Sequence, residues 1–221
     1  MSNPVKTNFK TEWFSLSLII IGFLLSYYFF QNFPAQVPSH WNINGEVDAY
    51  SGPLMAALMI PILMLVMYIG FFFMPYLDPK KEQYADFSPV YHKFKELFLV
   101  FFLILYFLTG LSGLGYKIDI AFCVPVMIGW LFVAIGLLLR KIKMNWFVGI
   151  RTPWTLSSET VWTKTNKFGS NLMMIAGVLI AATVLVANLY KIILFVGAVS
   201  LMVFAAPIYS YILYRQEQKK K

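Results

Sequence analysis

The sequence predicts an all-α integral membrane protein with about six transmembrane helices in three hairpins, plus a short interfacial helix on the cytoplasmic side. Three observations carry this prediction: an apolar composition, six apolar stretches of spanning length, and an uneven distribution of Lys and Arg. Hydrophobic residues make up 59% of the 221 positions and charged residues only 13%, against roughly 25% in a typical soluble domain. A chain this short and apolar is expected to have lipid as its main solvent.

Six apolar stretches come near the ~20 residues that an α-helix needs to cross a bilayer. They are Trp13–Gln31, Leu54–Leu77, Leu97–Leu114, Ile120–Leu139, Leu172–Leu189 and Ile192–Tyr214. None of them contains Asp, Glu, Lys, Arg or His. The first is longer than a typical signal-peptide core and no small-residue cleavage site follows it, so we expect a retained helix. The single cysteine, Cys123, lies inside the fourth stretch, which leaves no disulfide framework and no Cys-based metal site.

The distribution of Lys and Arg predicts the orientation in the membrane. With a cytoplasmic N-terminus, the inner segments are 1–12, 78–96, 140–171 and 215–221. These segments hold 16 of the 18 Lys and Arg residues, and the outer segments hold only Lys117 and Lys191. Because cytoplasmic loops are enriched in Lys and Arg, both termini are predicted to be cytoplasmic. This topology explains the net charge of +8 without a nucleic-acid-binding surface.

The loops divide the chain into two modules that are expected to pack as one membrane domain. Residues 1–96 form an N-terminal module of two helices, with a long extracellular loop at 32–53 and a cytoplasmic loop at 78–96. Residues 97–221 form a C-terminal module of four helices, with a cytoplasmic motif loop at 140–171. The outer connections at 115–119 and 190–191 are predicted to be tight turns.

The inner loop 78–96 contains a helix start. Ser88 is a suitable N-cap and Pro89 fits the first helical position. The third helix is therefore expected to begin near Pro89, in the interface, and to run into the membrane. His92 is expected to be a solvated interfacial histidine rather than part of a proton relay.

The outer loop 32–53 contains a turn. Asn44-Gly45 is a strong turn signal. The runs on either side, His40–Ile43 and Glu46–Tyr50, are expected to form either a short hairpin or a tight loop that lies on the bundle.

Three side chains of this outer loop raise the question of a metal site. His40, Glu46 and Asp48 would in principle bind a divalent cation, but Zn²⁺ sites usually have three or four His, Cys or acidic ligands, and only one His is present here. The favoured interpretation is a folded extracellular cap with hydrogen-bonded polar side chains. We therefore predict no metal and no cofactor.

The motif loop 140–171 carries the densest local signals in the chain. They are an extended Thr152-Pro153 step, Ser157 as an N-cap, Glu159 in a first turn and Gly169 just past a helix end. Together they predict a short amphipathic helix over 158–168. Trp146, Trp154 and Trp162 are expected at the lipid headgroup level. Two interpretations stay open: an anchor that fixes the fourth and fifth helices, or a docking surface.

Two strings in the sequence resemble a known family. Residues 149–156 (GIRTPWTL), followed by Val161-Trp162, Lys164-Thr165 and Gly169, resemble the signature of the SdpI-like bacterial membrane proteins. The outer string Val37-Pro38, His40-Trp41-Asn42, Gly45 and Asp48 resembles the N-terminal module associated with that family, known as a domain of unknown function. The chain departs from the usual pattern at Asn166, where the family has His, and at Ser170, where it commonly has Gly.

The resemblance implies a protein of the bacterial cell membrane that gives immunity to a secreted peptide toxin. It also implies a sensor that captures a cytoplasmic winged-helix repressor when it engages the toxin, without direct nucleic-acid binding. The residues expected to face the toxin are His40, Trp41, Asn42, Gly45, Glu46 and Asp48. The cytoplasmic motif comprises Arg151, Thr152, Pro153, Trp154, Thr155, Glu159, Trp162, Lys164 and Asn166.

Two other classes of function were weighed against immunity. A membrane enzyme is disfavoured because the sequence has no His-Glu-x-x-His, no Gly-x-Ser-x-Gly and no paired acids in the spans, so no catalytic residue is predicted. A transporter usually places charged residues on its path inside the membrane, and the predicted spans contain none. A small transporter of a neutral or lipid-like substrate escapes that argument and remains the main alternative.

Overall fold

The structure, a computed structural model, describes residues 4–5 and 7–220. Within this part of the chain, six helices are long and apolar enough to cross a membrane. They are α1 (Phe9–Asn32), α2 (Pro53–Leu77), α3 (Tyr84–Gly113), α4 (Ile120–Leu139), α6 (Glu159–Ala182) and α7 (Asn188–Gln218). The remaining elements are a hairpin of β1 (Val37–Trp41) and β2 (Val47–Ser51), the short helix α5 (Pro153–Ser157), and the 3-10 turns η1 (Lys81–Gln83) and η2 (Thr183–Leu185). The chain is a multi-pass, all-α membrane protein, which confirms the predicted fold class.

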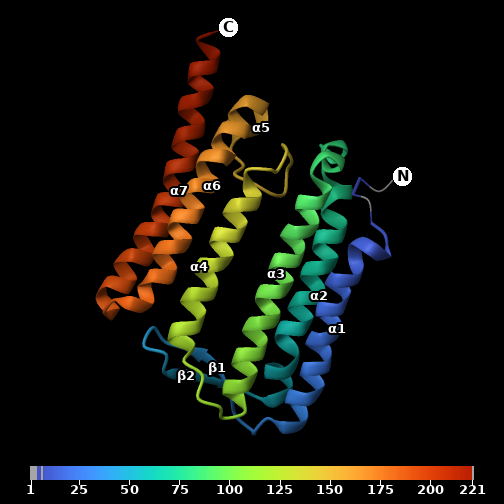
Figure 1. Ribbon diagram of the computed structural model, residues 1–221, viewed down its shortest axis with the longest axis vertical. Coiled ribbons are helices and arrows are strands. Elements are labelled where there is room, and N and C mark those ends of the chain that lie inside the picture. Colours follow the sequence, from blue (N-terminus) through green and yellow to red (C-terminus); the bar gives the residue numbers. More distant parts are fainter. Residues whose placement is uncertain (1–3, 6, 221) are drawn as a thin grey trace.

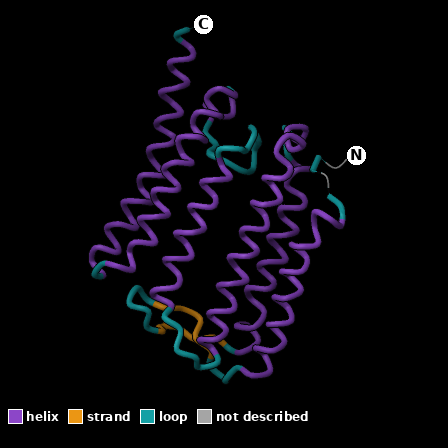
Figure 2. The backbone as a smooth tube through the Cα atoms, viewed as in Figure 1, coloured by secondary structure: helices purple, strands orange, loops and turns teal. Residues whose placement is uncertain are grey.

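The six long helices run side by side and form three antiparallel hairpins (Figure 1). The N- and C-terminal ends lie at the same end of the bundle as α5, and the β hairpin lies at the opposite end (Figures 1 and 2). Helices α1, α2 and α3 pack on one another, whereas α4 packs on α6 and α6 on α7. The two groups of three helices meet where α3 contacts α4. We call the end with α5 the inner end and the end with the hairpin the outer end.

Glycines allow α4 and α6 to approach closely. A Cβ atom added at Gly177 would lie 2.5 Å from the carbonyl oxygen of Gly129, so neither position tolerates a side chain without movement. A Cβ at Gly129 would also lie 2.7 Å from the Cβ of Ala181. Small residues at helix contacts are a common way to pack helices in lipid. Gly129, Gly177 and Ala181 therefore let α4 and α6 pack closely.

The start of α3 differs from the prediction. The helix begins at Tyr84 rather than near Pro89, and Phe87 interrupts it with a non-helical backbone (φ −128°, ψ 18°). Pro89 lacks a backbone N–H, so it cannot donate the helical hydrogen bond to the carbonyl four residues earlier. Ser88-Pro89 therefore marks a kink inside an already started helix.

The predicted short helix over 158–168 is wrong in its extent. Helix α6 begins at Glu159 and continues without a break to Ala182. Ser158, not Ser157, caps it by accepting a hydrogen bond from the Val161 amide. Gly169 does not end the helix but lies inside it. A side chain at this position would overlap Ile150, which explains the need for glycine. The glycine serves close packing, and the short inner helix is α5.

The last outer turn is also displaced from the prediction. The sequence placed it at 190–191, but η2 ends at Leu185 and α7 begins at Asn188. Residues 184–186 are Val, Leu and Val, so hydropathy alone does not separate them from the helix before them. A turn made of apolar residues has no compositional signal.

Candidate functional site

The outer hairpin is held together by Asn42. Its side-chain oxygen accepts hydrogen bonds from the amides of Asn44 (2.9 Å) and Glu46 (3.0 Å). Its side-chain nitrogen donates to the Glu46 carboxylate at 2.8 Å. Gly45 has φ +81°, a left-handed conformation that favours glycine. Of the two predicted forms of this loop, the hairpin is the one observed.

The polar residues on the two strands pair with each other. The His40 Nδ1 and Asp48 Oδ1 atoms lie 2.5 Å apart, and their side chains are 68% and 43% exposed. The Glu46 carboxylate instead accepts the hydrogen bond from the Asn42 side chain. Across the described residues, no group of three or more His, Cys, Asp or Glu side chains is placed to hold a metal ion. The hairpin therefore has a surface whose polar groups are exposed.

The tip of the hairpin lies on the helix bundle. Asn188, at the start of α7, donates a hydrogen bond to the Asn44 side chain at 2.5 Å. A Cβ at Gly45 would lie 2.8 Å from the Cβ of Ala121 in α4, so the glycine permits the tip to sit directly on that helix. The hairpin thus contacts both α4 and α7.

Two apolar cavities lie beside the hairpin, and Trp41 lines both of them. One, of about 290 Å³, lies beneath the tip and is lined also by Ile43 and by residues of α4 and α7. The other, of about 470 Å³, lies between the hairpin and helices α2, α3 and α4. The outer end therefore combines exposed polar groups with apolar space large enough for side chains or an acyl chain.

The predicted cytoplasmic motif is folded into the inner end of the bundle through hydrogen bonds, most of them buried. Asn166 accepts from the Ile150 amide at 2.8 Å and donates to the Trp162 carbonyl at 3.0 Å. The indole N–H of Trp162 donates to the Ile142 carbonyl at 3.0 Å. Trp162 and Asn166 are 2% and 1% exposed. Asn166, which stands where the family usually has His, therefore holds the loop before α5 onto α6.

Helix α5 is fixed in the same manner. Thr152 caps it and forms a capping box with Thr155. The Thr155 hydroxyl also donates to the Ile150 carbonyl at 3.0 Å, and the Thr152 hydroxyl lies 3.0 Å from that of Ser210 in α7. Pro153 is the first residue of the helix, where its missing N–H needs no partner. The inner motif therefore joins α5, α6 and α7.

The predicted placement of the three tryptophans at the headgroup level is not uniform. Trp162 is buried in the protein, contrary to the prediction, because α6 turns it toward Ile142. Trp146 is 49% exposed, and Trp154 is half-buried against the ring of Tyr211, with 5.0 Å between ring centroids. Of the three rings, Trp146 is the most exposed.

The charged residues of the motif are exposed. The Arg151 guanidinium donates to the Trp146 carbonyl at 2.6 Å. Glu159 accepts a hydrogen bond from Gln83 at 3.5 Å, and Lys164 is exposed on α6. These side chains, unlike the buried Thr, Trp and Asn of the motif, remain open to a partner.

A second buried polar group ties the motif loop to the N-terminal module. The Asp78 carboxylate, 2% exposed, accepts hydrogen bonds from the Tyr84 hydroxyl and the Trp146 amide, both at 2.9 Å. Asn145, also buried, accepts from the amides of Phe147 and Val148. The loop between α2 and α3 and the loop after α4 are therefore joined through one carboxylate.

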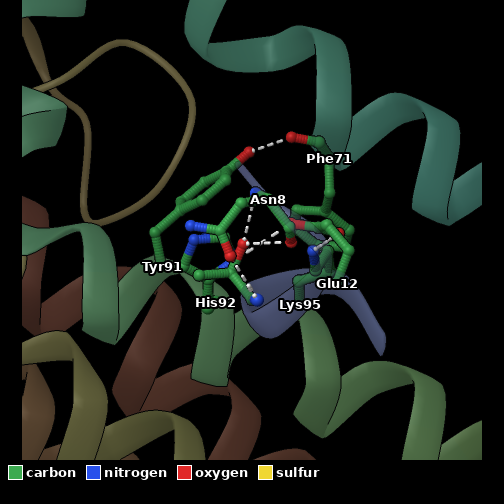
Figure 3. Close-up of polar contacts among 7 residues, drawn as sticks. Asn8, Glu12, Phe71, Tyr91, His92 and Lys95 are labelled. Atoms are coloured by element: carbon green, nitrogen blue, oxygen red, sulfur yellow. Dashed lines mark hydrogen bonds and ion pairs between the residues drawn. The ribbon is translucent and has the colours of Figure 1, made fainter. Parts of the chain in front are cut away.

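Sequence reasoning missed a charged cluster between α1 and α3, shown in Figure 3. The Lys95 ammonium lies 2.5 Å from the Glu12 carboxylate, and His92 Nδ1 lies 3.4 Å from the other carboxylate oxygen. Glu12, His92 and Lys95 are 7%, 9% and 3% exposed. The Lys95 ammonium also lies 5.1 Å from the centre of the Tyr68 ring in α2. The prediction that His92 is solvated is wrong, because α1 covers it.

The cluster escaped notice because the predicted spans began just after it. Trp13 and Leu97 are the first residues of the first and third apolar stretches, whereas α1 begins at Phe9 and α3 at Tyr84. The helices therefore include ionisable residues that the apolar stretches exclude. The usable signal was the spacing of His92 and Lys95, since residues three apart share a helix face.

Comparisons with known proteins match both modules. Residues 141–211 match the SdpI/YfhL protein family, and residues 17–65 match a domain of unknown function, DUF1648. The chain is also 28% identical over 207 residues to the immunity protein SdpI of Bacillus subtilis (strain 168), which covers 94% of this chain and 97% of that protein. The chain is thus similar to SdpI-like membrane proteins along most of its length. No solved structure matches it.

The two matched regions include the inner motif and the outer hairpin, respectively. Residues 141–211 include the motif loop, α5, α6 and most of α7. Residues 17–65 include most of α1, the whole outer hairpin and the first half of α2. Glu12, His92 and Lys95 lie outside both regions. The charged cluster is thus a feature that neither family match describes.

Proposed function

We propose that this chain is a membrane immunity protein that protects its cell from a secreted peptide toxin. The observation that carries the proposal is its alignment with an immunity protein along nearly the whole of both chains. In this proposal the outer hairpin and the neighbouring helix ends face the toxin. The predicted motif residues at the inner end act on the other side of the membrane.

The geometry of the outer end supports this role. Membrane-active peptides insert an apolar face into the interface. Trp41 and Ile43 border an apolar cavity, and Asp48 and Glu46 are exposed close by. Such a surface offers apolar and aromatic contacts to one face of a peptide and anionic contacts to the other. It would hold the peptide at the interface and keep it from assembling in the lipid.

The arrangement of α7 supports the finer proposal that the protein also reports toxin to a cytoplasmic repressor. At its outer end, Asn188 bonds to Asn44 of the hairpin. Near its inner end, Ser210 contacts Thr152, and Tyr211 packs on Trp154. One helix therefore touches both the toxin-facing hairpin and the motif. A shift of the hairpin on toxin binding would be passed to the inner surface by this helix.

The proposed direction of signalling requires the inner end to be cytoplasmic. The bias of Lys and Arg toward the inner segments supports that orientation. In a Cys123→Ser background, Asn44→Cys should react with a membrane-impermeant thiol reagent added outside intact cells, and Lys164→Cys should react only after the cells are opened. Labelling of both positions from outside would contradict the orientation.

The immunity proposal is tested by survival. The chain is expressed in a toxin-sensitive bacterium, which is challenged with a secreted peptide encoded beside its gene and with a panel of other secreted peptides. Survival should rise with the intact chain against at least one of them. Equal survival with and without the chain against every peptide would refute immunity.

A small transporter is the second candidate function, because ionisable residues inside membrane helices often mark substrate pathways. Glu12 and Lys95 are ionisable residues near the inner ends of two membrane helices. In this structure they neutralise each other, so a neutral or lipid-like substrate fits them better than an ion. Uptake of labelled lipid analogues that depends on the Glu12–Lys95 pair would favour this candidate.

A further inference from the structure

We propose that the cavity between α1 and α3 at the inner end binds the phosphate-bearing headgroup of a phospholipid. This cavity, of about 560 Å³, is lined by α1 around Trp13 and by the first turns of α3 after its kink. It lies next to the charged cluster, since His92 lines it and also contacts Glu12. It is separate from the hairpin and from the motif.

The depth of the cavity matches the headgroup level. Lys95 stands 18 residues before the outer end of α3 at Gly113, a distance of ~27 Å along an α-helix. The hydrocarbon core of a bilayer is about 30 Å thick. If the outer end of α3 lies at one edge of the hydrocarbon, the cluster and its cavity lie at the other edge, where phosphates are found.

The charge of the lining favours an anion. Lys10 and Lys93 are exposed at the cavity, and Glu96 is the acidic residue among its lining side chains. Two ammonium groups against one carboxylate leave a net positive charge, which suits a phosphodiester. Lys95 does not contribute, because its ammonium is held by Glu12. The buried pair instead fixes α1 against α3 beside the cavity.

The neutral lining completes a site for a phosphate. Ser88 carries a hydroxyl group and Asn8 a carboxamide at the cavity, whereas the Thr11 hydroxyl, which also lines it, donates to the Asn8 carbonyl. Lysine ammonium and hydroxyl groups are common donors to phosphate oxygens. The described residues thus surround the cavity with hydrogen-bonding groups from both helices.

The apolar side of the cavity identifies the occupant as a lipid rather than a free phosphate. Phe14 and Pro89 line the cavity, and Trp13 is 53% exposed beside it. Phe9, one turn earlier, is 80% exposed. Exposed aromatic rings at this level contact lipid. A phospholipid would place its phosphate between the lysines and its acyl chains along these rings, which a soluble phosphate would leave uncovered.

The test is lipid binding to the full chain in a neutral detergent at physiological salt. Phosphatidylglycerol is titrated and bound lipid is counted by native mass spectrometry. Lys10→Gln with Lys93→Gln should weaken the tightest binding step by roughly 25-fold, since each lysine near a phosphate contributes about fivefold. The matched control is Lys141→Gln with Lys143→Gln, which removes the same charge from exposed positions of the inner loop and should change binding less than about twofold.

A second measurement places the lipid in the cavity. Brominated phosphatidylglycerol should quench the fluorescence of Trp13, and the part of the quenching that disappears in Trp13→Phe should also disappear in the Lys10/Lys93 double variant. Equal loss of binding in both lysine pairs, or no loss in either, would overturn the proposal. Saturable binding of glycerol phosphate that excludes the lipid would overturn its assignment to a lipid. Both measurements are independent of toxin, so their failure leaves the immunity proposal untouched.

Discussion

The inner motif and the outer hairpin are both rich in polar side chains, but they use them in opposite ways. At the inner end, Thr155 and Asn166 are 0% and 1% exposed, and they accept or donate within the fold. At the outer end, the side chains of His40 and Asp48 are 68% and 43% exposed. Buried polar groups need their hydrogen-bond partners within the protein, because a buried group without a partner lowers the stability of the fold. Substitutions at the inner end should therefore reduce stability first, and substitutions at the outer end should reduce binding first.

The largest expected effect is at the charged cluster. Lys95→Ala leaves the Glu12 carboxylate buried without its ammonium partner and should lower the free energy of unfolding by about 3–5 kcal/mol. Thermal unfolding of the purified protein in detergent measures this loss. Lys167→Ala, which removes an exposed ammonium from α6, is the control. If the two variants unfold at the same temperature, the cluster does not stabilise the contact between α1 and α3.

Trp162→Ala should have an effect in the same range at the motif. The ring is 2% exposed and its N–H is bonded to the Ile142 carbonyl, so its removal leaves a cavity and costs about 3–5 kcal/mol. Protection from toxin should fall because less protein folds. Lys164→Ala, two residues along the same helix and exposed, should stay within about 0.5 kcal/mol of the unsubstituted protein. Comparable unfolding of the two variants would show that the motif is a surface rather than a structural joint.

Asn166→Ala should lower the free energy of unfolding by less than Trp162→Ala, and it tests the structural role of the motif through a single hydrogen bond. The substitution leaves the partly buried Ile150 amide without its acceptor and should cost about 1–3 kcal/mol. Asn166→His introduces the residue that the family usually has, whose ring nitrogen can also accept a hydrogen bond. We expect the His variant to be more stable than the Ala variant. Equal stability of the two would mean that the Ile150 amide does not depend on an acceptor at this position.

The sequence predicts the membrane architecture well, because that architecture depends on long stretches of one physical character. Six apolar runs fix six helices, and Asn44-Gly45 fixes the turn of the hairpin. Boundaries are harder, because they depend on local contacts. Gly169 is a residue type that often follows a helix end, yet it lies inside α6. The position needs glycine because Ile150 packs against it. Ser88-Pro89 has the composition of a helix start but lies at a kink.

The candidate sites show the same division. The turn of the hairpin could be predicted from neighbouring residues alone, since its hydrogen bonds join residues a few positions apart. The prediction left a hairpin and a tight loop open around that turn. The charged cluster could not be predicted, because Glu12 and Lys95 are far apart in the chain and meet only when α1 packs on α3. The burial of Trp162 likewise depends on Ile142, in a loop that folds back over α6. Local chemistry is readable in a single sequence, and tertiary pairing is not.

The central claim is that the outer hairpin binds toxin while the buried residues of the inner motif maintain the fold. Survival normalised to membrane abundance tests this claim most directly. Trp41→Ala combined with Asp48→Ala removes one aromatic and one anionic contact from the hairpin. Asp48 forms only an exposed pair with His40, which is worth at most about 1 kcal/mol. The account predicts that this double variant stays abundant in the membrane but loses protection, whereas Asn166→Ala loses protection only in proportion to its lost abundance. Full protection by the hairpin variant at normal abundance would contradict the account.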